Sequence, residues 1–182
     1  MTRILGLDVS LSATGVALPD GTFATIRHGK PKTIGYLRHA QLLERVYVEL
    51  ARARPDVVVV EDYAPRALGI NSLIVAGELQ GPIRTRLELL GIPWVGVRPN
   101  TLKLYATGKG NARKEAMADA AEADLPRGAP RPGNFDEADA YWLRAMGADH
   151  YDDGLGNGLE HRVKALESVA WPDLEEDTDG TP

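Results

Sequence analysis

The sequence predicts an α/β protein whose mixed five-stranded sheet carries helices on both faces. Three short apolar segments come first and are joined by short turns, which is the pattern of antiparallel strands. Apolar strands then alternate with segments of helical periodicity, which implies that two parallel strands are added to the same sheet. The 182 residues are enough for one sizeable domain, and 43% hydrophobic and 26% charged residues are typical of a globular protein.

The first half of the chain predicts four strands and one helix. Residues 3–9 have the composition of a strand buried on both faces, and residues 14–19 and 22–29 form two more strands around a tight Pro-Asp-Gly turn. Residues 37–55 have apolar side chains at helical spacing and end in a proline. Residues 56–63 contain four consecutive valines, which is typical of a buried parallel strand.

The second half predicts helices around one further strand. We expect a helix over residues 70–91, a strand over 92–99, helices over 101–108 and 112–126, and a helix over 134–150. Asn134 precedes this last helix and is a favoured N-cap residue. Together these elements make residues 1–150 one domain.

The remaining residues, 151–182, have a different composition. They hold nine acidic and two basic residues, whereas residues 1–150 hold seventeen acidic and nineteen basic ones. We expect a linker, a short amphipathic helix that packs on the body, and an acidic disordered end. The apolar stripe of this helix is formed by Leu159, Val163, Leu166 and Val169.

The chain has no cysteine, which excludes a disulfide framework, thiolate metal ligands and a cysteine nucleophile. No apolar run approaches the ~20 residues that a membrane helix needs. The first residues lead directly into a strand, and no signal peptide is visible. We therefore expect a cytoplasmic protein without a membrane partner.

Four carboxylates stand where a packed protein would not normally place them. Asp8 lies near the end of the first strand, on the side of Ile4 and Gly6, and Glu61 ends the valine strand. Asp136 and Asp139 are three residues apart and therefore share one face of the last helix. Each acid alone could cap a turn or oppose a helix dipole.

Together, the four acids favour a metal site. The first and fourth strands are expected to be neighbours that end at one sheet edge, and the last helix could cover that edge. Converging carboxylates repel each other unless cations neutralise them, and all-oxygen ligands suit Mg²⁺ or Mn²⁺. Two such ions about 4 Å apart can position a water and stabilise the leaving oxygen in phosphodiester hydrolysis.

An ordered set of motifs adds a family resemblance over about residues 3–148. "ILGLDVSLSATGVAL", "VVVVEDY", "GELQG", "RPNTLKLYATGKGNARKEAM" and "DEADAYWL" follow one another. This set resembles the RuvC-like Holliday junction resolvases of the RNase H-like superfamily. The resemblance implies an RNase H-like sheet and a homodimer that nicks two strands of a four-way DNA junction. It also implies that the catalytic and metal-binding residues are Asp8, Glu61, Asp136 and Asp139, with two Mg²⁺ ions bound and Mn²⁺ as a substitute.

One ligand position stays open in this comparison, because Glu137 is an alternative to Asp136. Tyr63 lies near a position where the family uses an aromatic residue to engage junction DNA, although it is one residue out of step.

Basic residues gather around a glycine-rich link. Lys103, Lys109, Arg113 and Lys114 fall within twelve residues, and Gly108 and Gly110 interrupt them. Such a link can approach DNA phosphates closely. Lys103 and Lys114 match basic positions of the family motif, whereas for Arg113 alone a solvated helix face is the better interpretation.

Several other functions remain open at this point. The same acids and fold would suit a nuclease for flaps, other branched DNA or structured RNA. A non-catalytic nucleic-acid-binding module is disfavoured because all four acids are present. A sugar-kinase or actin-like ATPase has a similar first hairpin, but it needs a second domain and a second phosphate loop, which this chain does not show.

Overall fold

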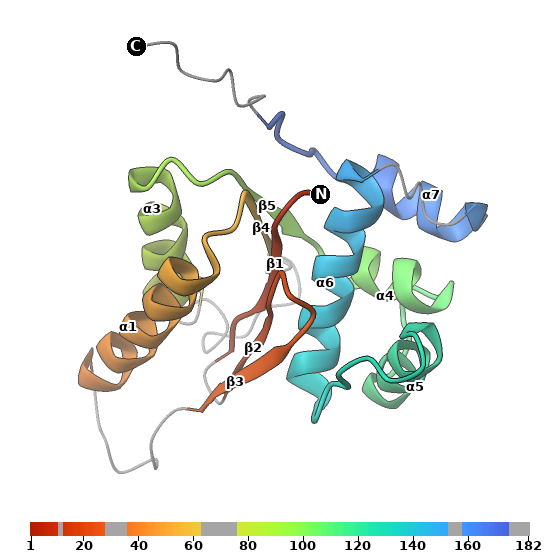
Figure 1. Ribbon diagram of the computed structural model, residues 1–182, viewed down its shortest axis with the longest axis horizontal. Coiled ribbons are helices and arrows are strands. Elements are labelled where there is room, and N and C mark those ends of the chain that lie inside the picture. Colours follow the sequence, from red (N-terminus) through yellow and green to blue (C-terminus); the bar gives the residue numbers. More distant parts are fainter. Residues whose placement is uncertain (11–12, 28–35, 63–75, 153–157, 175–182) are drawn as a thin grey trace.

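The computed structural model describes residues 1–10, 13–27, 36–62, 76–152 and 158–174. In this part of the chain five strands form one mixed sheet, in the order β3-β2-β1-β4-β5 (Figure 1). β1 (Ile4–Asp8), β2 (Ala13–Ala17) and β3 (Phe23–Arg27) are antiparallel neighbours. β4 (Val57–Glu61) and β5 (Trp94–Val97) extend the sheet in parallel from β1. The predicted mixed sheet, including the pairing of the first and fourth strands, is confirmed.

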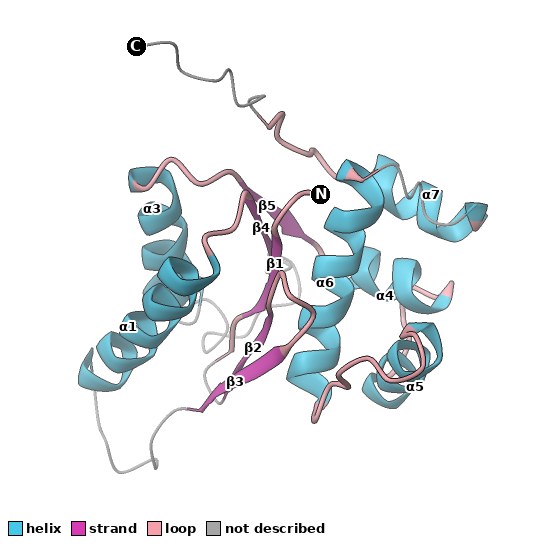
Figure 2. Ribbon diagram, in the orientation of Figure 1, coloured by secondary structure: helices cyan, strands magenta, loops and turns pink. Residues whose placement is uncertain are grey.

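Helices cover both faces of the sheet (Figure 2). One face carries α1 (Tyr36–Ala53) and α3 (Gly81–Leu89), and the other carries α4 (Pro99–Thr107), α5 (Lys114–Asp124), α6 (Phe135–Tyr151) and α7 (Glu160–Glu167). Strand alternation divides the core accordingly. Leu5 and Leu7 belong to the apolar cluster under α1 and α3, whereas Ile4 belongs to the cluster under α6.

The helix predicted over residues 70–91 differs from the structure in detail. Residues 70–75 lie outside the described ranges, and Ala76–Gln80 form a π-helical turn, η1, that leads into α3. A π-turn widens the helix by one residue, and the apolar spacing of the sequence contains no signal for it. The N-cap prediction is confirmed, because the Asn134 side chain accepts a hydrogen bond of 3.0 Å from the Glu137 amide.

α6 lies directly on the sheet because glycines leave room for its backbone. A Cβ atom at Gly6 would lie 2.1 Å from the carbonyl oxygen of Ala140, and one at Gly15 would lie 2.0 Å from that of Asp136. Real Cβ atoms do not approach this closely, and therefore only glycine allows the contact. The glycines of β1 and β2 thus fix how far the first turns of α6 descend onto the strands.

The short helix α7 packs mainly on α4 and contributes to the same core. The predicted apolar stripe is wrong at its first member, because the side chain of Leu159 is 46% exposed. The buried residues of the helix are Arg162, Ala165 and Leu166. The buried face therefore includes Arg162, which pairs with the carboxylates of Asp124 and Asp149, as well as Leu166 of the predicted stripe.

Residues after α7 return to the end of α6. The Trp171 ring stacks on the His150 ring with centroids 4.5 Å apart, and the Tyr151 hydroxyl donates a 2.8 Å hydrogen bond to the Pro172 carbonyl. Part of the predicted disordered end, residues 175–182, lies outside the described ranges. Within those ranges, every helix falls short of the length and apolarity needed to cross a membrane.

Candidate active site

Asp8 and Glu61 occupy the ends of two neighbouring parallel strands. Leu7 of β1 is paired with Val60 of β4, so the next residue on each strand brings the two carboxyl groups to the same sheet edge. Asp8 is only 5% exposed. By strand alternation it points to the side of Gly6, where α6 lies. Asp8 therefore ends a buried strand with its side chain under the helix.

Helix α6 brings Asp136 and Asp139 to this edge. Its first turn stands over Gly15, and Gly15 is paired with Asp8 across the β1–β2 ladder. Asp136 and Asp139 both act on the Asp8 carboxyl electrostatically, as does Glu61. The structure thus brings together the four acids that the sequence singled out.

Burial and mutual repulsion favour protonation of these acids. Burial, followed by the charges of Glu61, Asp139 and Asp136, raises the pKa of Asp8 well above its usual range. Burial and the charge of Asp139 raise the pKa of Glu61 to about 7, although a hydrogen bond from Asp8 opposes that shift. Burial, together with the charge of Asp136, raises the pKa of Asp139 to about 6. Near neutral pH a proton is therefore held between Asp8 and Glu61.

The donor chemistry of this cluster fits a hard divalent cation, because it offers carboxylate oxygens without sulfur or imidazole. As the side chains stand, no group of three or more acidic or histidine residues in the described ranges is already arranged to hold an ion. A cation that binds both Asp8 and Glu61 would have to displace a proton held by the pair. Displacing it is the step that would turn a protonated pair into a pair of ligands.

Glu137, the alternative to Asp136, is engaged elsewhere. Its carboxylate accepts a 2.6 Å hydrogen bond from the Gly133 amide and a further one from the Thr25 hydroxyl. The Asn134 side chain donates to the same Thr25 hydroxyl at 2.7 Å. This is a capping arrangement that ties the start of α6 to β3. The Asn-x-x-Glu spacing was the sequence signal for it, and it favours Asp136 as the ligand.

Gln80 supports the end of β4, although sequence reasoning gave it no role. Its buried side chain donates a 3.1 Å hydrogen bond to the Glu61 carbonyl oxygen. Arg84 donates to Gln80 at 3.1 Å and to Asp62 at 2.8 Å. These contacts fix the backbone that carries Glu61. The "GELQG" motif contained Gln80, but its contact with a strand 19 residues away is visible only in three dimensions.

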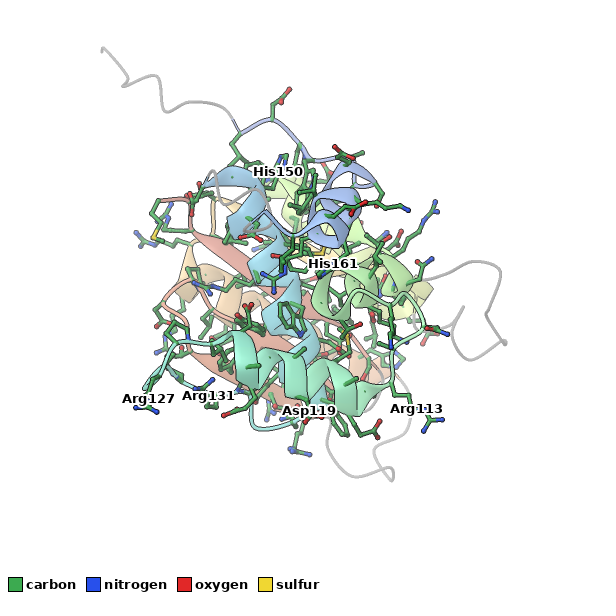
Figure 3. The ribbon with its side chains drawn as sticks, turned by 90° about the vertical axis from the view of Figure 1, so that its right-hand side faces the viewer. Arg113, Asp119, Arg127, Arg131, His150 and His161 are labelled. Carbon is green, nitrogen blue, oxygen red and sulfur yellow. The ribbon has the colours of Figure 1, made fainter. Side chains whose placement is uncertain are left out.

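The four predicted basic residues fall into two groups. Lys103 on α4 and Lys114 on α5 lower the pKa values of Glu61 and Asp139 and therefore lie near the acids. Lys109 and Arg113 are exposed and line a separate hollow of about 620 Å³. Arg113 is labelled in Figure 3. Tyr63 lies outside the described residues. Two of the four cations are thus part of the acidic site, and two stand further out.

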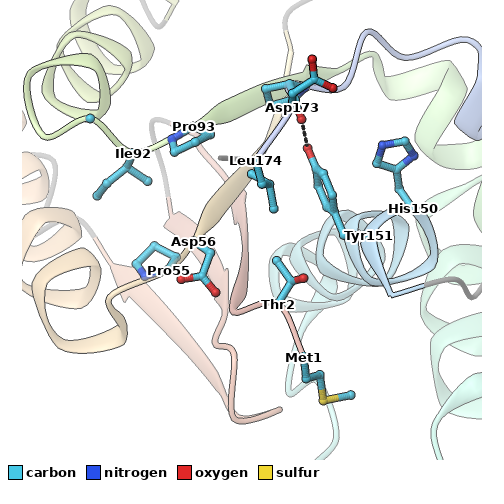
Figure 4. Close-up of a pocket in the computed structure, with 12 residues that line it drawn as sticks. Met1, Thr2, Pro55, Asp56, Ile92, Pro93, His150, Tyr151, Asp173 and Leu174 are labelled. Carbon is cyan, nitrogen blue, oxygen red and sulfur yellow. Dashed lines mark hydrogen bonds between the residues drawn. The ribbon is translucent and has the colours of Figure 1, made fainter. Parts of the chain in front are cut away.

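A second hollow, of about 1040 Å³, lies at the opposite end of the sheet (Figure 4). It is lined by residues such as Thr2, Asp56 and Tyr151. The Asp56 carboxylate is already bound by Arg3, with a 2.7 Å hydrogen bond from the Arg3 amide. The hollow is therefore separate from the four acids, which stand at the carboxyl ends of β1 and β4.

Comparison with known proteins gives the family. No protein-family model matches the chain. The chain is 30% identical over 147 residues to the crossover junction endodeoxyribonuclease RuvC of Chlorobaculum parvum, with 74% of this chain and 76% of the relative covered. It is 34% identical over 143 residues to the RuvC of Anaeromyxobacter dehalogenans, with 75% of each chain covered.

A solved structure shares the fold. Thermus thermophilus RuvC in complex with a Holliday junction substrate matches with a TM-score of 0.63 and 23% identity, over 85% of this chain and 97% of that chain. The motifs, the mixed sheet and the sequence relatives all agree. The chain therefore belongs to the RuvC family of crossover junction endodeoxyribonucleases.

Proposed function

We propose that the protein is a metal-dependent endonuclease that resolves four-way DNA junctions by paired nicks. One observation carries the proposal: the buried Asp8 and the half-buried Glu61 stand side by side at the ends of β1 and β4, where the first turns of α6 lie over β1 and β2. A carboxyl group whose pKa is raised by burial and by neighbouring acids, as at Asp8 and Glu61, is costly in a purely structural role. Their position becomes favourable when a cation binds.

The proposed ligands are Asp8, Glu61, Asp136 and Asp139. Two Mg²⁺ ions, or Mn²⁺ in their place, would supply an activated water and stabilise the leaving oxygen of the phosphodiester. The water oxygen forms a bond to phosphorus while the bond to the leaving oxygen breaks. The protein holds the acids under α6, and burial at the sheet edge limits access of bulk water.

Lys103 and Lys114 have a different part in this proposal. Their charges act on Glu61 and Asp139 from α4 and α5, which supports a role for the two ammonium groups in contacting a phosphate bound at the acids. Lys109 and Arg113 stand exposed further along the same stretch of chain and are proposed to contact the DNA backbone.

The proposed assembly is a homodimer, because two nicks in opposite strands of one junction call for two active sites. Apolar side chains at the end of α3 are available for such a contact. Leu89 and Leu90 are both exposed, and Leu90 borders a hollow of about 330 Å³ shared with Tyr47 of α1. Light scattering during size exclusion would measure the mass, and a strictly monomeric chain would remove this part of the proposal.

A cleavage panel tests the function. Four-way junctions, flaps, linear duplexes and structured RNA would be incubated with the full chain and Mg²⁺, Mn²⁺ or a chelator. We expect metal-dependent, paired nicks in the junction and at least about 100-fold slower cleavage of linear duplex. Preferred cutting of flaps or RNA would instead support a related nuclease with another substrate.

The control variant is Asp8→Asn, which keeps the size of the side chain but removes its charge. We expect this variant to bind the junction and not to cut it. Cleavage at the wild-type rate by Asp8→Asn would refute the proposed site, whatever the substrate.

A further inference from the structure

Arg162 of α7 is a buried cation that contacts three other helices. Its side chain is only 6% exposed. The guanidinium donates a 2.6 Å hydrogen bond to Asp124, the last residue of α5, and lies 3.9 Å from Asp149 of α6. It also stands over the Tyr105 ring of α4, with its central carbon 4.8 Å from the ring centroid. One side chain of the C-terminal helix therefore touches α4, α5 and α6.

Two tyrosines complete the same network. The Tyr105 hydroxyl donates a 2.5 Å hydrogen bond to Asp149, and the Tyr141 hydroxyl donates a 2.5 Å hydrogen bond to Asp124. Each carboxylate thus meets the Arg162 cation and one tyrosine. We call this group the Arg162 clamp; it consists of Arg162, Asp124, Asp149, Tyr105 and Tyr141.

The geometry of the clamp is demanding. The guanidinium is planar, and its donors diverge in fixed directions. The guanidinium donates to Asp124 at the end of α5, lies 3.9 Å from Asp149 of α6 and stands over the Tyr105 ring, so its position relates the ends of these helices to α4. A buried ion pair commonly adds little stability compared with well-packed apolar residues, so its clearest effect is on the arrangement of its partners.

The clamped helices are the ones that carry the positive charges of the active site. Lys103 stands two residues before Tyr105 on α4, and Lys114 is the first residue of the helix that Asp124 ends. α7 also touches the glycine-rich link, because a Cβ atom at Gly108 would lie 3.7 Å from the His161 ring (Figure 3). The clamp thus joins the end of the chain to the two helices that carry Lys103 and Lys114.

We propose that Arg162 is a positioning residue for DNA cleavage, which it serves by holding α4 and α5 at the spacing from α6 where Lys103 and Lys114 face the four acids. The proposal rests on the proposed function of that site. It assigns a task to the C-terminal helix, which lies outside the predicted nuclease domain of residues 1–150.

The experiment uses the full chain and Arg162→Lys, which keeps a positive charge but removes the planar fork. Arg131→Lys is the matched control, because Arg131 also bonds near the end of α5, to the Glu122 carbonyl at 2.8 Å, but is exposed and outside the clamp. Circular dichroism gives the folded fraction of each variant, and all rates are scaled to it. Asp124→Asn is a second variant for the case in which Arg162→Lys does not fold.

Two quantities are measured on a four-way junction: the dissociation constant and the single-turnover cleavage rate at saturating protein. We expect Arg162→Lys to lower the rate by about tenfold or more while the dissociation constant changes by less than about threefold. Arg131→Lys should leave both unchanged. A rate decrease below about threefold for Arg162→Lys would overturn the proposal.

A double-variant cycle separates positioning from general stability. If Arg162 acts through the lysines, Arg162→Lys should cost little further activity in a chain that already carries Lys103→Ala and Lys114→Ala. If Arg162→Lys lowers the cleavage rate by the same factor in that chain as in the wild type, the positioning role is overturned. Absence of junction cleavage by the wild-type chain would instead refute the proposed function, so the two failures are distinguishable.

Discussion

Gly6 of β1 lies directly beneath the carbonyl of Ala140 in α6, at a distance that leaves no space for a side chain. The same strand ends two residues later in Asp8, and Asp136 lies four residues earlier in the same helix. The contact therefore determines the distance between the carboxyl groups on α6 and the carboxyl group of Asp8 on β1.

Gly6→Ala should displace α6 and damage both stability and cleavage. The added methyl would stand 2.1 Å from the Ala140 oxygen, and overpacking of this kind costs about 1–3 kcal/mol or more. Urea unfolding measures the free energy of unfolding, and junction cleavage measures the site. Gly77→Ala is the control, because apart from its chain neighbours and the backbone of its own helical turn no atom in the described part of the chain lies within 4 Å of its Cβ position. Equal stability of the two variants would contradict this account of α6.

The metal-free protein should become less stable as the pH rises from about 4.5 to about 7. The folded-state pKa of Glu61 is raised to about 7 from its ordinary value of 4.5, so the folded protein holds a proton that the unfolded chain has released. The stabilising effect of that proton is complete below the unfolded pKa and is lost as the pH passes through the folded pKa.

Removing one charge should therefore stabilise the metal-free chain at high pH. We expect Glu61→Gln to raise the free energy of unfolding at pH 8 by on the order of 2 kcal/mol relative to the wild type, and by much less at pH 4. Thermal or urea unfolding in a chelating buffer at both pH values is the measurement. A Glu61→Gln variant that is less stable than the wild type at pH 8 would show that the acids do not repel one another there.

Divalent cations should restore the stability that the metal-free chain loses at high pH. Mg²⁺ or Mn²⁺ that binds only the folded chain raises its melting temperature, and at 100 times the dissociation constant the gain is about 2.7 kcal/mol. Because cation binding displaces the proton shared by Asp8 and Glu61, the gain should be larger at pH 8 than at pH 5. Differential scanning fluorimetry with the wild type and Asp8→Asn tests this, and an equal cation response of both proteins would argue against the ligand assignment.

Removing the charge of Asp136 should mainly affect cleavage, whereas removing the charge of Glu137 should mainly affect stability. Asp136→Asn should lower junction cleavage by at least about 100-fold and leave unfolding nearly unchanged. Glu137→Gln should weaken the bonds to Thr25 and Gly133, cost about 1 kcal/mol of stability and change cleavage by less than about threefold. Single-turnover kinetics and urea unfolding of both variants decide the matter. The reverse pattern would make Glu137 the ligand.

Lys109→Ala should weaken DNA binding without slowing the cut. The side chain is exposed at the glycine-rich link, and removing one ammonium group from a DNA phosphate should reduce the salt dependence of junction binding by about one unit of slope. Fluorescence anisotropy at several salt concentrations measures the slope. Lys103→Ala should instead lower the cleavage rate at saturating protein, because Lys103 acts on Glu61. If the two variants have the same effects on binding and on the cleavage rate, the division of the basic residues into two functional groups is wrong.

The sequence allowed much of this site to be predicted, because its signals were local. Alternation placed Asp8 and Glu61 on one face of two buried strands, and the three-residue spacing placed Asp136 beside Asp139. The resemblance to junction resolvases, read from five short motifs, agrees with the sequence relatives.

What could not be predicted depends on contacts between distant segments. Gly6 and Gly15 are unremarkable in a strand until the helix above them is known. Arg162 was overlooked because the apolar stripe of its helix indicated another buried face, and its partners stand 38 and 13 residues back along the chain, at Asp124 and Asp149. A local pattern contains no information about such pairs.

The last acid of the site lies far behind the first along the polypeptide, since Asp8 is made early and Asp139 only after three-quarters of the chain. During synthesis the sheet strands emerge from the ribosome first, and α6 can settle onto β1 and β2 only once residue 151 is out. A nascent or prematurely terminated chain that ends before α6 therefore lacks two of the four proposed ligands, and we expect it not to cleave DNA.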